Sequence, residues 1–228
     1  MPGDMLGFPG PESATTTSPA GTLNPETTIS IYEDFYGMQA ATTDFAYSWI
    51  AGGGNGPAHQ TTPRGIVRAI GDAGATNAGF CMGPAAASAI CTNITLNPSF
   101  YTRWAQVGTG AATRFIGLGP ANSAIFTTPV DGIYFRHTNA GSIIAVCRKA
   151  SAETTLDTLV VAADGVFHTG RLVVTDAGAS VQVFVDGASK GVINTNVPTV
   201  NLNIACGADT VSNTNGLDVD YFFMTQAR

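Results

Sequence analysis

Short apolar runs separated by turn residues recur along this chain from residue 29 onward, and they restrict its fold more than any other feature. No window sustains the 3.6-residue apolar period of an amphipathic helix. The runs span residues 29–36, 45–50, 65–70, 90–94, 100–104, 124–128, 132–137, 142–147, 155–161, 170–174, 181–185, 200–204 and 217–223. Strand-length runs with this spacing predict an all-β fold, an antiparallel sandwich or barrel.

The last run predicts which residues face the core. Alternation places Leu217, Val219, Tyr221 and Phe223 on one wholly apolar face. Successive side chains of a strand point to opposite faces of the sheet, so we expect these four to be buried together. Asp218 and Asp220 begin the other face.

Charged residues make up only 11% of the 228 residues, whereas about 25% is usual for a soluble domain. The 44% apolar content is ample for a core, and no apolar run approaches the ~20 residues of a membrane-spanning helix. The net charge is −6 and the few Lys and Arg residues form no cluster, which argues against a nucleic-acid partner. So little charge suggests that a permanent partner covers part of the surface.

The first 28 residues differ in composition from the rest. Seventeen of them are Pro, Gly, Ser or Thr, and none is Lys or Arg. Such a segment buries too little apolar surface to offset its ordering entropy, so we expect an extended arm over 1–28 and a single sandwich domain over 29–228. Met5, Leu6 and Phe8 are its candidate contacts with a neighbouring subunit, and a frayed terminus is the alternative. With no signal-peptide pattern, we expect synthesis in a cytoplasm.

Catalytic patterns are weak. Gly187-Ala-Ser189-Lys-Gly191 matches the nucleophile elbow of esterases, but it follows the hairpin signal Asp186-Gly187 and precedes no helix. Asp218 and Asp220 could act as an acid pair, although neither has a glutamate partner in its own strand. Outside the arm the only glutamates are Glu33 and Glu153. We therefore expect no catalytic residues, and a sandwich glycoside hydrolase stays open as a third hypothesis.

Metal and cofactor sites are equally unsupported, so no cofactor is expected. The histidines His59, His137 and His168 lack ligand spacing, and the oxygen-rich stretch 209–220 lacks the register of a calcium loop. The glycine-rich stretch 52–56 is not followed by the Lys-Ser/Thr of a phosphate-binding loop. We expect the four cysteines to be buried free thiols; they are Cys81, Cys91, Cys147 and Cys206.

Aromatic residues within strand runs could stack on sugar rings. The candidates are Tyr101 and Trp104, with Trp49 and Tyr134 also in strands. Burial in the core is the commoner role of such residues. Which role applies depends on the face of the sheet that each side chain occupies.

The C-terminal part resembles the concanavalin A-like and laminin-G-like jelly rolls. The resemblance rests on Arg171–Asp176, on Val181–Gly187 with its V-D-G ending, and on the closing Leu217–Phe223. It implies an antiparallel jelly-roll β-sandwich of the concanavalin A-like lectin type over residues 29–228. This fold hosts enzymes, lectins and structural modules alike.

The run Asn24–Phe35 and the Thr-, Ala-, Gly- and Asn-rich body resemble capsid decoration, or cement, proteins of tailed bacteriophages. That resemblance implies a virion structural protein on the outer capsid surface that binds the major capsid protein as a homo-oligomer, with a trimer favoured. The alternative is a carbohydrate-binding module on a phage fibre or head surface, with a host glycan as ligand.

Overall fold

The computed structural model describes residues 28–33, 47–52, 58–59, 65–70, 77–82, 92–120, 129–138, 141–209 and 214–227. Its strands are β1 (Thr28–Glu33), β2 (Tyr47–Gly52), β3 (Ala58–His59), β4 (Val67–Ile70), β5 (Asn77–Met82), β6 (Ser99–Val107), β7 (Thr113–Gly119), β8 (Gly132–His137), β9 (Ser142–Lys149), β10 (Ala152–Val161), β11 (Phe167–Thr175), β12 (Ser180–Val185), β13 (Ala188–Ile193), β14 (Asn203–Asp209) and β15 (Gly216–Ala227). Within this part of the chain the only helical segments are the short 3-10 turns η1 (Ile94–Leu96) and η3 (Asp176–Gly178). The predicted all-β class is confirmed.

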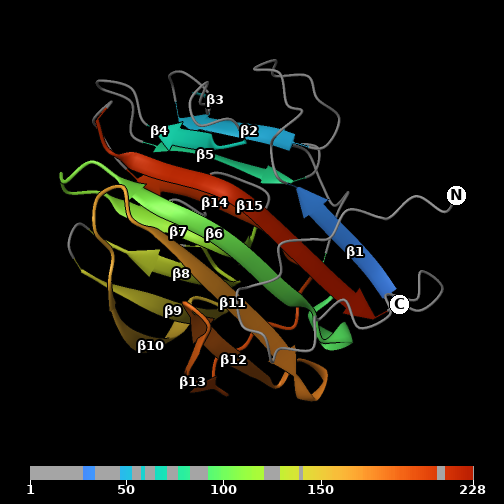
Figure 1. The fold of residues 1–228 in the computed structure, drawn as a ribbon. Helices are drawn as coiled ribbons and strands as arrows, with labels where there is room; N and C mark the ends of the chain where they lie inside the picture. Colours follow the sequence, from blue (N-terminus) through green and yellow to red (C-terminus); the bar gives the residue numbers. More distant parts are fainter. Residues whose placement is uncertain are drawn as a thin grey trace, which may run out of the picture.

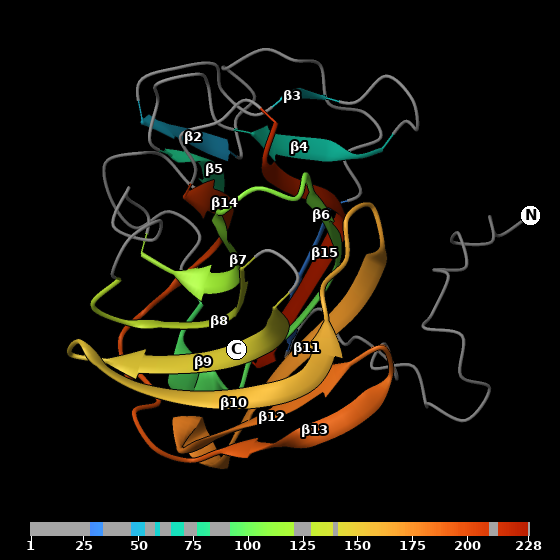
Figure 2. The ribbon, with the colours of Figure 1, turned by 90° about the vertical axis from the view of Figure 1, so that its left-hand side faces the viewer.

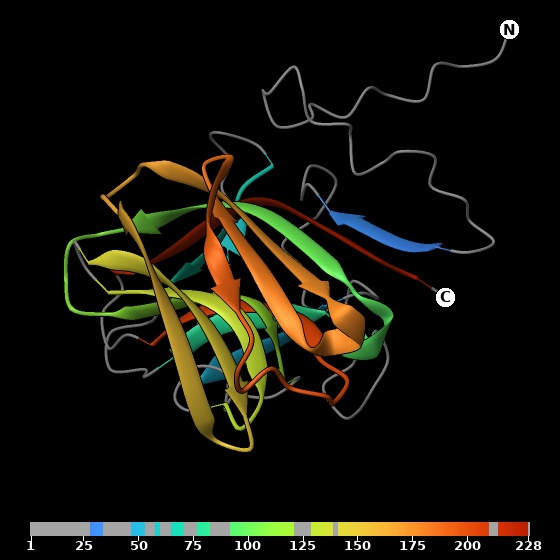
Figure 3. The ribbon, with the colours of Figure 1, turned by 90° about the horizontal axis from the view of Figure 1, so that it is seen from below.

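The strands form two antiparallel sheets that pack as the layers of a sandwich (Figure 1). Sheet A has the order β13-β12-β11-β6-β15-β4-β3, and sheet B has the order β10-β9-β8-β7-β14-β5-β2. β15 pairs with β6 along one side, and with β4 and then β1 along the other. β1 therefore lies beside the end of β15, as the view from below shows (Figure 3).

The core lies between the sheets. In β11 buried and half-buried residues alternate along all nine positions, and its buried residues Leu172 and Val174 face the other sheet. Trp104 of β6 stacks on Phe135 of β8 with ring centroids 5.1 Å apart, which joins the two layers. Such burial of apolar surface is the main stabilising contribution to the fold.

The edges of the two sheets meet where β10 approaches β13 (Figure 2). The hydroxyls of Thr154 and Thr195 are 2.8 Å apart, and the Asn196 side-chain amide donates to Thr154 Oγ1 at 3.0 Å. Edge strands carry unpaired backbone groups, so side-chain bonds between β10 and the chain after β13 help to cover this edge.

A β-bulge in β15 changes which residues face the core, and it corrects the expected apolar face. The register with β6 shifts between Val219 and Tyr221. Leu217 and Val219 are buried before the shift, but Phe222 and Met224 are buried after it. An extra residue moves every later side chain to the opposite face, so Tyr221 and Phe223 lie on the outer face of sheet A.

One expected strand differs from the structure, and the expected strand over 124–128 lies outside the described residues. The run 90–94 was expected as a strand, but its described part is an isolated bridge at Thr92 followed by η1. Asn93 accounts for this, because its side chain accepts a bond from the Thr95 backbone N–H and caps the turn.

β7 lies outside the expected strand runs, as do β3 and β5, and it contains glycines and Arg114. That arginine is fully buried and donates to four backbone carbonyls, those of Gly216, Ala112, Val107 and Gly108. A buried cation is tolerated only when its donors are satisfied, as they are here. Burial lowers the pKa of this guanidinium.

Residues 1–27 lie outside the described residues, so the division into an arm and a domain stays a prediction. Across the described part of the chain, no helix has the length and apolar character needed to cross a membrane.

Candidate functional site

Five side chains form a row across the outer face of sheet A, running perpendicular to its strands. Tyr32 of β1 pairs with Phe223 of β15, Phe223 with Tyr101 of β6, Tyr101 with Arg171 of β11, and Arg171 with Phe184 of β12. Directly paired residues project from the same face of a sheet. We call these five residues the aromatic–arginine row; with strands about 4.8 Å apart it is ~19 Å long.

The rings of the row contact one another. The ring centroids of Tyr32 and Phe223 are 6.3 Å apart, and those of Phe223 and Tyr101 are 6.0 Å apart. The Arg171 guanidinium lies 4.8 Å from the Tyr101 centroid and 5.0 Å from the Phe184 centroid. A guanidinium within about 6 Å of a ring is attracted by its π face, so these contacts hold the row in place.

A second pair of contacts lies next to the row. The Arg103 guanidinium stands 4.4 Å from the centroid of the Phe167 ring and forms an ion pair with Asp220. Tyr221, which pairs with Arg103, brings its ring to 6.5 Å from Tyr32. The outer face of sheet A thus combines aromatic surface with charged hydrogen-bonding groups.

Two polar atoms in the middle of the row have no hydrogen-bond partner in the part of the chain that the structure describes. They are the Tyr101 hydroxyl and the Arg171 Nε. Burial raises the pKa of Tyr101, so its hydroxyl stays a neutral donor. An unsatisfied buried donor costs about 1–3 kcal/mol, and a ligand hydroxyl placed there would remove that cost.

Of the two aromatic residues predicted to stack on sugar, only Tyr101 lies on the outer face. Trp104 is fully buried, and its indole N–H donates to His137 Nε2 at 3.4 Å. Positions 101 and 104 differ by an odd number in one strand, so they occupy opposite faces. Trp104 is therefore a core residue, and the expectation that it stacks on a ligand is corrected. Tyr134 is also fully buried, and the side chain of Trp49 lies outside the described residues.

The candidate carboxylates whose side chains are described each form an ion pair with arginine. Arg68 donates to both carboxylate oxygens of Asp218, at 2.6 and 2.7 Å, and Asp220 pairs with Arg103. Glu153 accepts from two arginines, and the side chain of Glu33 lies outside the described residues. A general acid must deliver a proton to the substrate, whereas each of these three carboxylates is engaged by arginine in an ion pair.

The esterase-like pentapeptide lies in a hairpin, as expected from its sequence context. Asp186 and Gly187 both have positive φ, 51° and 75°, and connect β12 to β13, where Ser189 lies exposed. His168 contacts the Asp186 carboxylate at 2.8 Å and not Ser189. No strand-to-helix turn exposes the serine, so the hydroxyl has no activated setting.

No group of three metal-binding side chains occurs among the described residues. His137 and His168 are buried in the sandwich, whereas the side chain of His59 lies outside the described residues. Cys147 and Cys206 are buried free thiols, as predicted, and burial raises the pKa of Cys147 to about 12. The other two cysteines are not among the described side chains.

The candidate arm contacts Met5, Leu6 and Phe8 also lie outside the described residues. Binding to a major capsid protein, a trimeric state and a place on the virion therefore stay predictions from sequence.

Comparisons with known proteins establish the fold. No family model matches this chain, and no curated protein matches it by sequence. The carbohydrate recognition domain of Emp47p is 10% identical, with a TM-score of 0.62, over 90% of this chain and 99% of that one. The Bacillus licheniformis beta-glucanase is 12% identical, with a TM-score of 0.58, over 86% and 97%.

A third similar structure is the Crh5 transglycosylase, 10% identical with a TM-score of 0.59, over 87% of this chain and 85% of that one. The chain thus has the concanavalin A-like jelly-roll fold, and the resemblance expected from its sequence is confirmed at the level of fold. At these identities the matches carry no residue roles to this chain.

Sequence reasoning identified one member of the aromatic–arginine row and missed the other four. Phe223 was expected in the core because alternation cannot reveal the bulge in β15. The other members come from strands far apart in sequence, and their alignment depends on sheet order. The one available signal was the abundance of aromatic residues and arginine at outward positions of β6 and β11.

Proposed function

We propose that this protein is a non-catalytic, lectin-like carbohydrate-binding module whose contact surface is the aromatic–arginine row. The observation that carries the proposal is the continuous row of rings and guanidinium on an outer sheet face. Aromatic rings on the surface of a β-sandwich offer flat apolar faces for the C–H faces of sugar rings. Tyr32 is 40% exposed, and the rest of the row is half-buried.

The row also combines a few hydrogen-bonding groups with its apolar rings, as a sugar ligand requires. Arg171 presents a planar set of donors between two rings, and its Nε has no partner. A binding site that mixes apolar surface with a few fixed polar groups is suited to a ligand with both kinds of surface. The row is ~19 Å long, which favours an extended saccharide over a single sugar.

The similar structures support the ligand class. Their names describe a carbohydrate recognition domain, a beta-glucanase and a transglycosylase. The arginine partners of Asp218, Asp220 and Glu153 support binding without hydrolysis. The same arrangement argues against the sandwich hydrolase hypothesis.

Binding is tested on a glycan array and by affinity electrophoresis in mixed-linkage β-1,3-1,4-glucan. We expect the native protein to bind at least one saccharide, and Tyr32→Ala and Arg171→Ala each to weaken that binding at least tenfold. Val192→Ala is the matched control: it removes an exposed apolar side chain from β13 of the same sheet and should leave binding unchanged.

Two outcomes would contradict the proposal. If no saccharide binds, or if binding survives the double variant Tyr32→Ala/Arg171→Ala, the row is not a sugar surface. Release of reducing ends from the glucan would show instead that the protein is an enzyme.

A further inference from the structure

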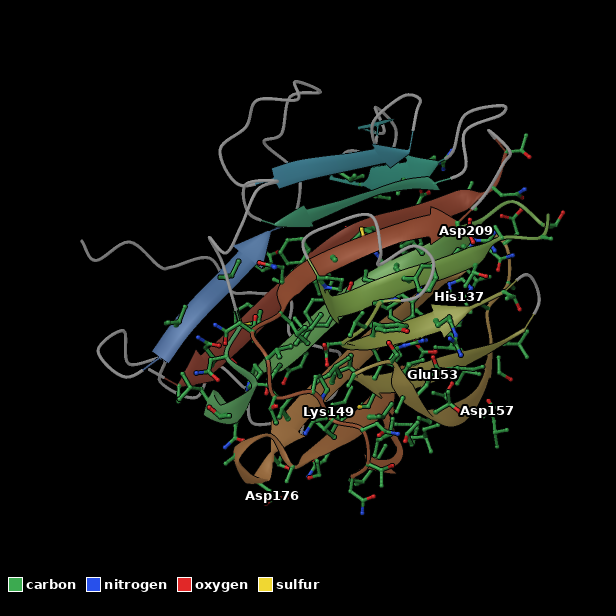
Figure 4. The ribbon with its side chains drawn as sticks, turned by 180° about the vertical axis from the view of Figure 1, so that it is seen from behind. His137, Lys149, Glu153, Asp157, Asp176 and Asp209 are labelled. Atoms are coloured by element: carbon green, nitrogen blue, oxygen red, sulfur yellow. The ribbon has the colours of Figure 1, made fainter. Side chains whose placement is uncertain are left out.

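A second cluster of polar side chains lies on the outer face of sheet B, opposite the face that packs in the core. It consists of Tyr134 and Arg136 from β8, Arg148 from β9 and Glu153 from β10, and we call it the sheet-B cluster. Figure 4 shows Glu153 among the strands β8 to β10. Tyr134 packs with Phe115 and Val146, an apolar group separate from the main core. The cluster uses no residue of the aromatic–arginine row.

Glu153 already has its charge compensated. Arg136 donates to both of its oxygens, at 3.0 and 2.8 Å, and Arg148 donates to one at 3.1 Å. Two guanidinium groups share this single carboxylate, so the cluster carries a net formal charge of +1. The exposed fractions of the side chains are 27% for Arg136, 24% for Glu153 and 16% for Arg148, so solvent reaches these three charged side chains.

Among the described residues, two donors in the cluster lack a well-formed hydrogen bond. Tyr134 is fully buried and its hydroxyl lies beside the Arg148 guanidinium without the geometry of a hydrogen bond, and the Nε of Arg148 is likewise buried and unpartnered. A donor that is buried and unpaired is unfavourable unless something binds it. Burial raises the pKa of Tyr134, so the hydroxyl stays protonated and can donate.

The backbone directs the Tyr134 side chain toward Arg148. A Cβ on Gly132 would come within 2.9 Å of the Tyr134 ring, so the ring leans over this glycine. Gly132 is the direct cross-strand partner of Arg148. A glycine at position 132 thus lets the tyrosine reach along its own strand toward the unpartnered guanidinium edge.

We infer that the sheet-B cluster is a binding site for one carboxylate group, held between the Arg148 guanidinium and the Tyr134 hydroxyl. A carboxylate would neutralise the excess positive charge and accept from both unpartnered donors. Arginine and carboxylate match in geometry and form strong charge-assisted bonds. The group can belong to an acidic sugar such as a uronate or to a free small carboxylate. This site is independent of the proposed function, because its residues and its chemistry differ from those of the row.

The test measures binding of D-glucuronate and of acetate by calorimetry, with D-glucose as the uncharged comparison. We expect glucuronate to bind and glucose not to bind at this site. Tyr134→Phe removes one hydroxyl and should weaken glucuronate binding about tenfold, while Arg148→Gln should abolish it. Stronger binding of glucuronate than of acetate identifies an acidic sugar; equal affinities identify a free carboxylate, and both support the site.

Stability provides a second readout that a merely structural tyrosine would not give. Without ligand, Tyr134→Phe should unfold at the same temperature as the native protein or at a higher one, because the lost hydroxyl is buried without a well-formed hydrogen bond. The matched control is Arg103→Gln on sheet A, which should leave glucuronate affinity unchanged. Tyr32→Ala should also leave it unchanged, so failure of this site and failure of the proposed function are distinguishable.

Two results would overturn the inference. One is that neither carboxylate binds the native protein. The other is that Tyr134→Phe folds normally and binds glucuronate as tightly as the native protein does.

Discussion

Leu159 has a backbone conformation that is unfavourable for its side chain. Its φ is +59°, and its side chain is 83% exposed, the most exposed of the large apolar residues described. It lies where the pairing of β10 with β9 shifts register between Asp157 and Val161. Its backbone N–H donates to Asp157 Oδ1 at 2.8 Å, which fixes the turn. A bulky residue at positive φ costs roughly 1–2 kcal/mol, and here no burial offsets that cost.

Replacing Leu159 with Asn should therefore stabilise the protein. Asparagine adopts this conformation far more readily, so we expect Leu159→Asn to raise the free energy of unfolding by about 1 kcal/mol. Urea unfolding monitored by fluorescence measures the change. Leu159→Ala is the control, because alanine lacks the short polar side chain that lets asparagine hydrogen-bond locally in this conformation, and it should change stability little. If the Asn variant is no more stable than the Ala variant, strain at this residue is not significant.

How much of the candidate site could be predicted from the sequence also differs from residue to residue. Tyr101 could be named from the sequence because aromatic residues in strands have few roles. Its face could not be derived, since Tyr101 and Trp104 both lie in one apolar run. Glu153 could be singled out as one of few glutamates, but its two arginine partners come from other strands, and only the order of sheet B brings them together.

At the scale of elements, β11 packs directly against the ring pair that joins the two sheets at Gly170. A Cβ at this position would lie 2.5 Å from atoms of both the Trp104 and Phe135 rings. The glycine is therefore required by packing, because the two stacked rings that join the sheets occupy the space of a side chain. Interiors are close-packed, so rings held on both sides cannot move away without loss of contacts.

Gly170→Ala should destabilise the sandwich by roughly 1–3 kcal/mol, the usual effect of overpacking. The shift in the urea midpoint at constant m-value measures it. Thr169→Ala is the control, since it alters the neighbouring residue on the other face of β11, which is half-buried. A loss no larger than that of the control would mean that the rings rearrange freely.

Most strands could be predicted from periodicity. Where the prediction from sequence was wrong or incomplete, a specific physical cause can be named. Tyr221-Phe222-Phe223-Met224 is apolar at every position, so alternation gives no indication of which pair is buried. The bulge that decides it depends on pairing with β6, which is not local information. β7 was missed because its buried arginine and glycines oppose strand propensity, and tertiary bonds to carbonyls overcome this.

At the scale of the whole molecule, the packing of the two sheets buries His137 in an interior that disfavours its protonated form. His137 is 2% exposed; its Nε2 accepts from Trp104, and its Nδ1 has no partner among the described residues. Burial is the main cause that lowers its pKa to about 3, and the nearby charges of Arg114 and His168 lower it further. The native state therefore holds this histidine neutral throughout the mildly acidic range.

Acid should consequently destabilise the protein through this single residue. In the unfolded chain a histidine has a pKa of about 6.5, so between pH 6.5 and 3 the unfolded state binds a proton that the native state does not. The contribution is fully present above pH 6.5 and is lost as the pH falls toward 3, at up to ~1.4 kcal/mol per pH unit. We expect the loss from pH 7 to pH 5 attributable to His137 to be about 2 kcal/mol.

Urea unfolding at pH 7 and pH 5 tests this with the variant His137→Gln, whose amide oxygen can still accept from the Trp104 indole. The variant should be less stable than the native protein at pH 7, because the amide fits the imidazole site imperfectly, but its stability should fall less on acidification. The difference between the two pH dependences isolates the histidine from all carboxylates, which both proteins share. Equal falls in the two proteins would show that His137 binds a proton in the native state.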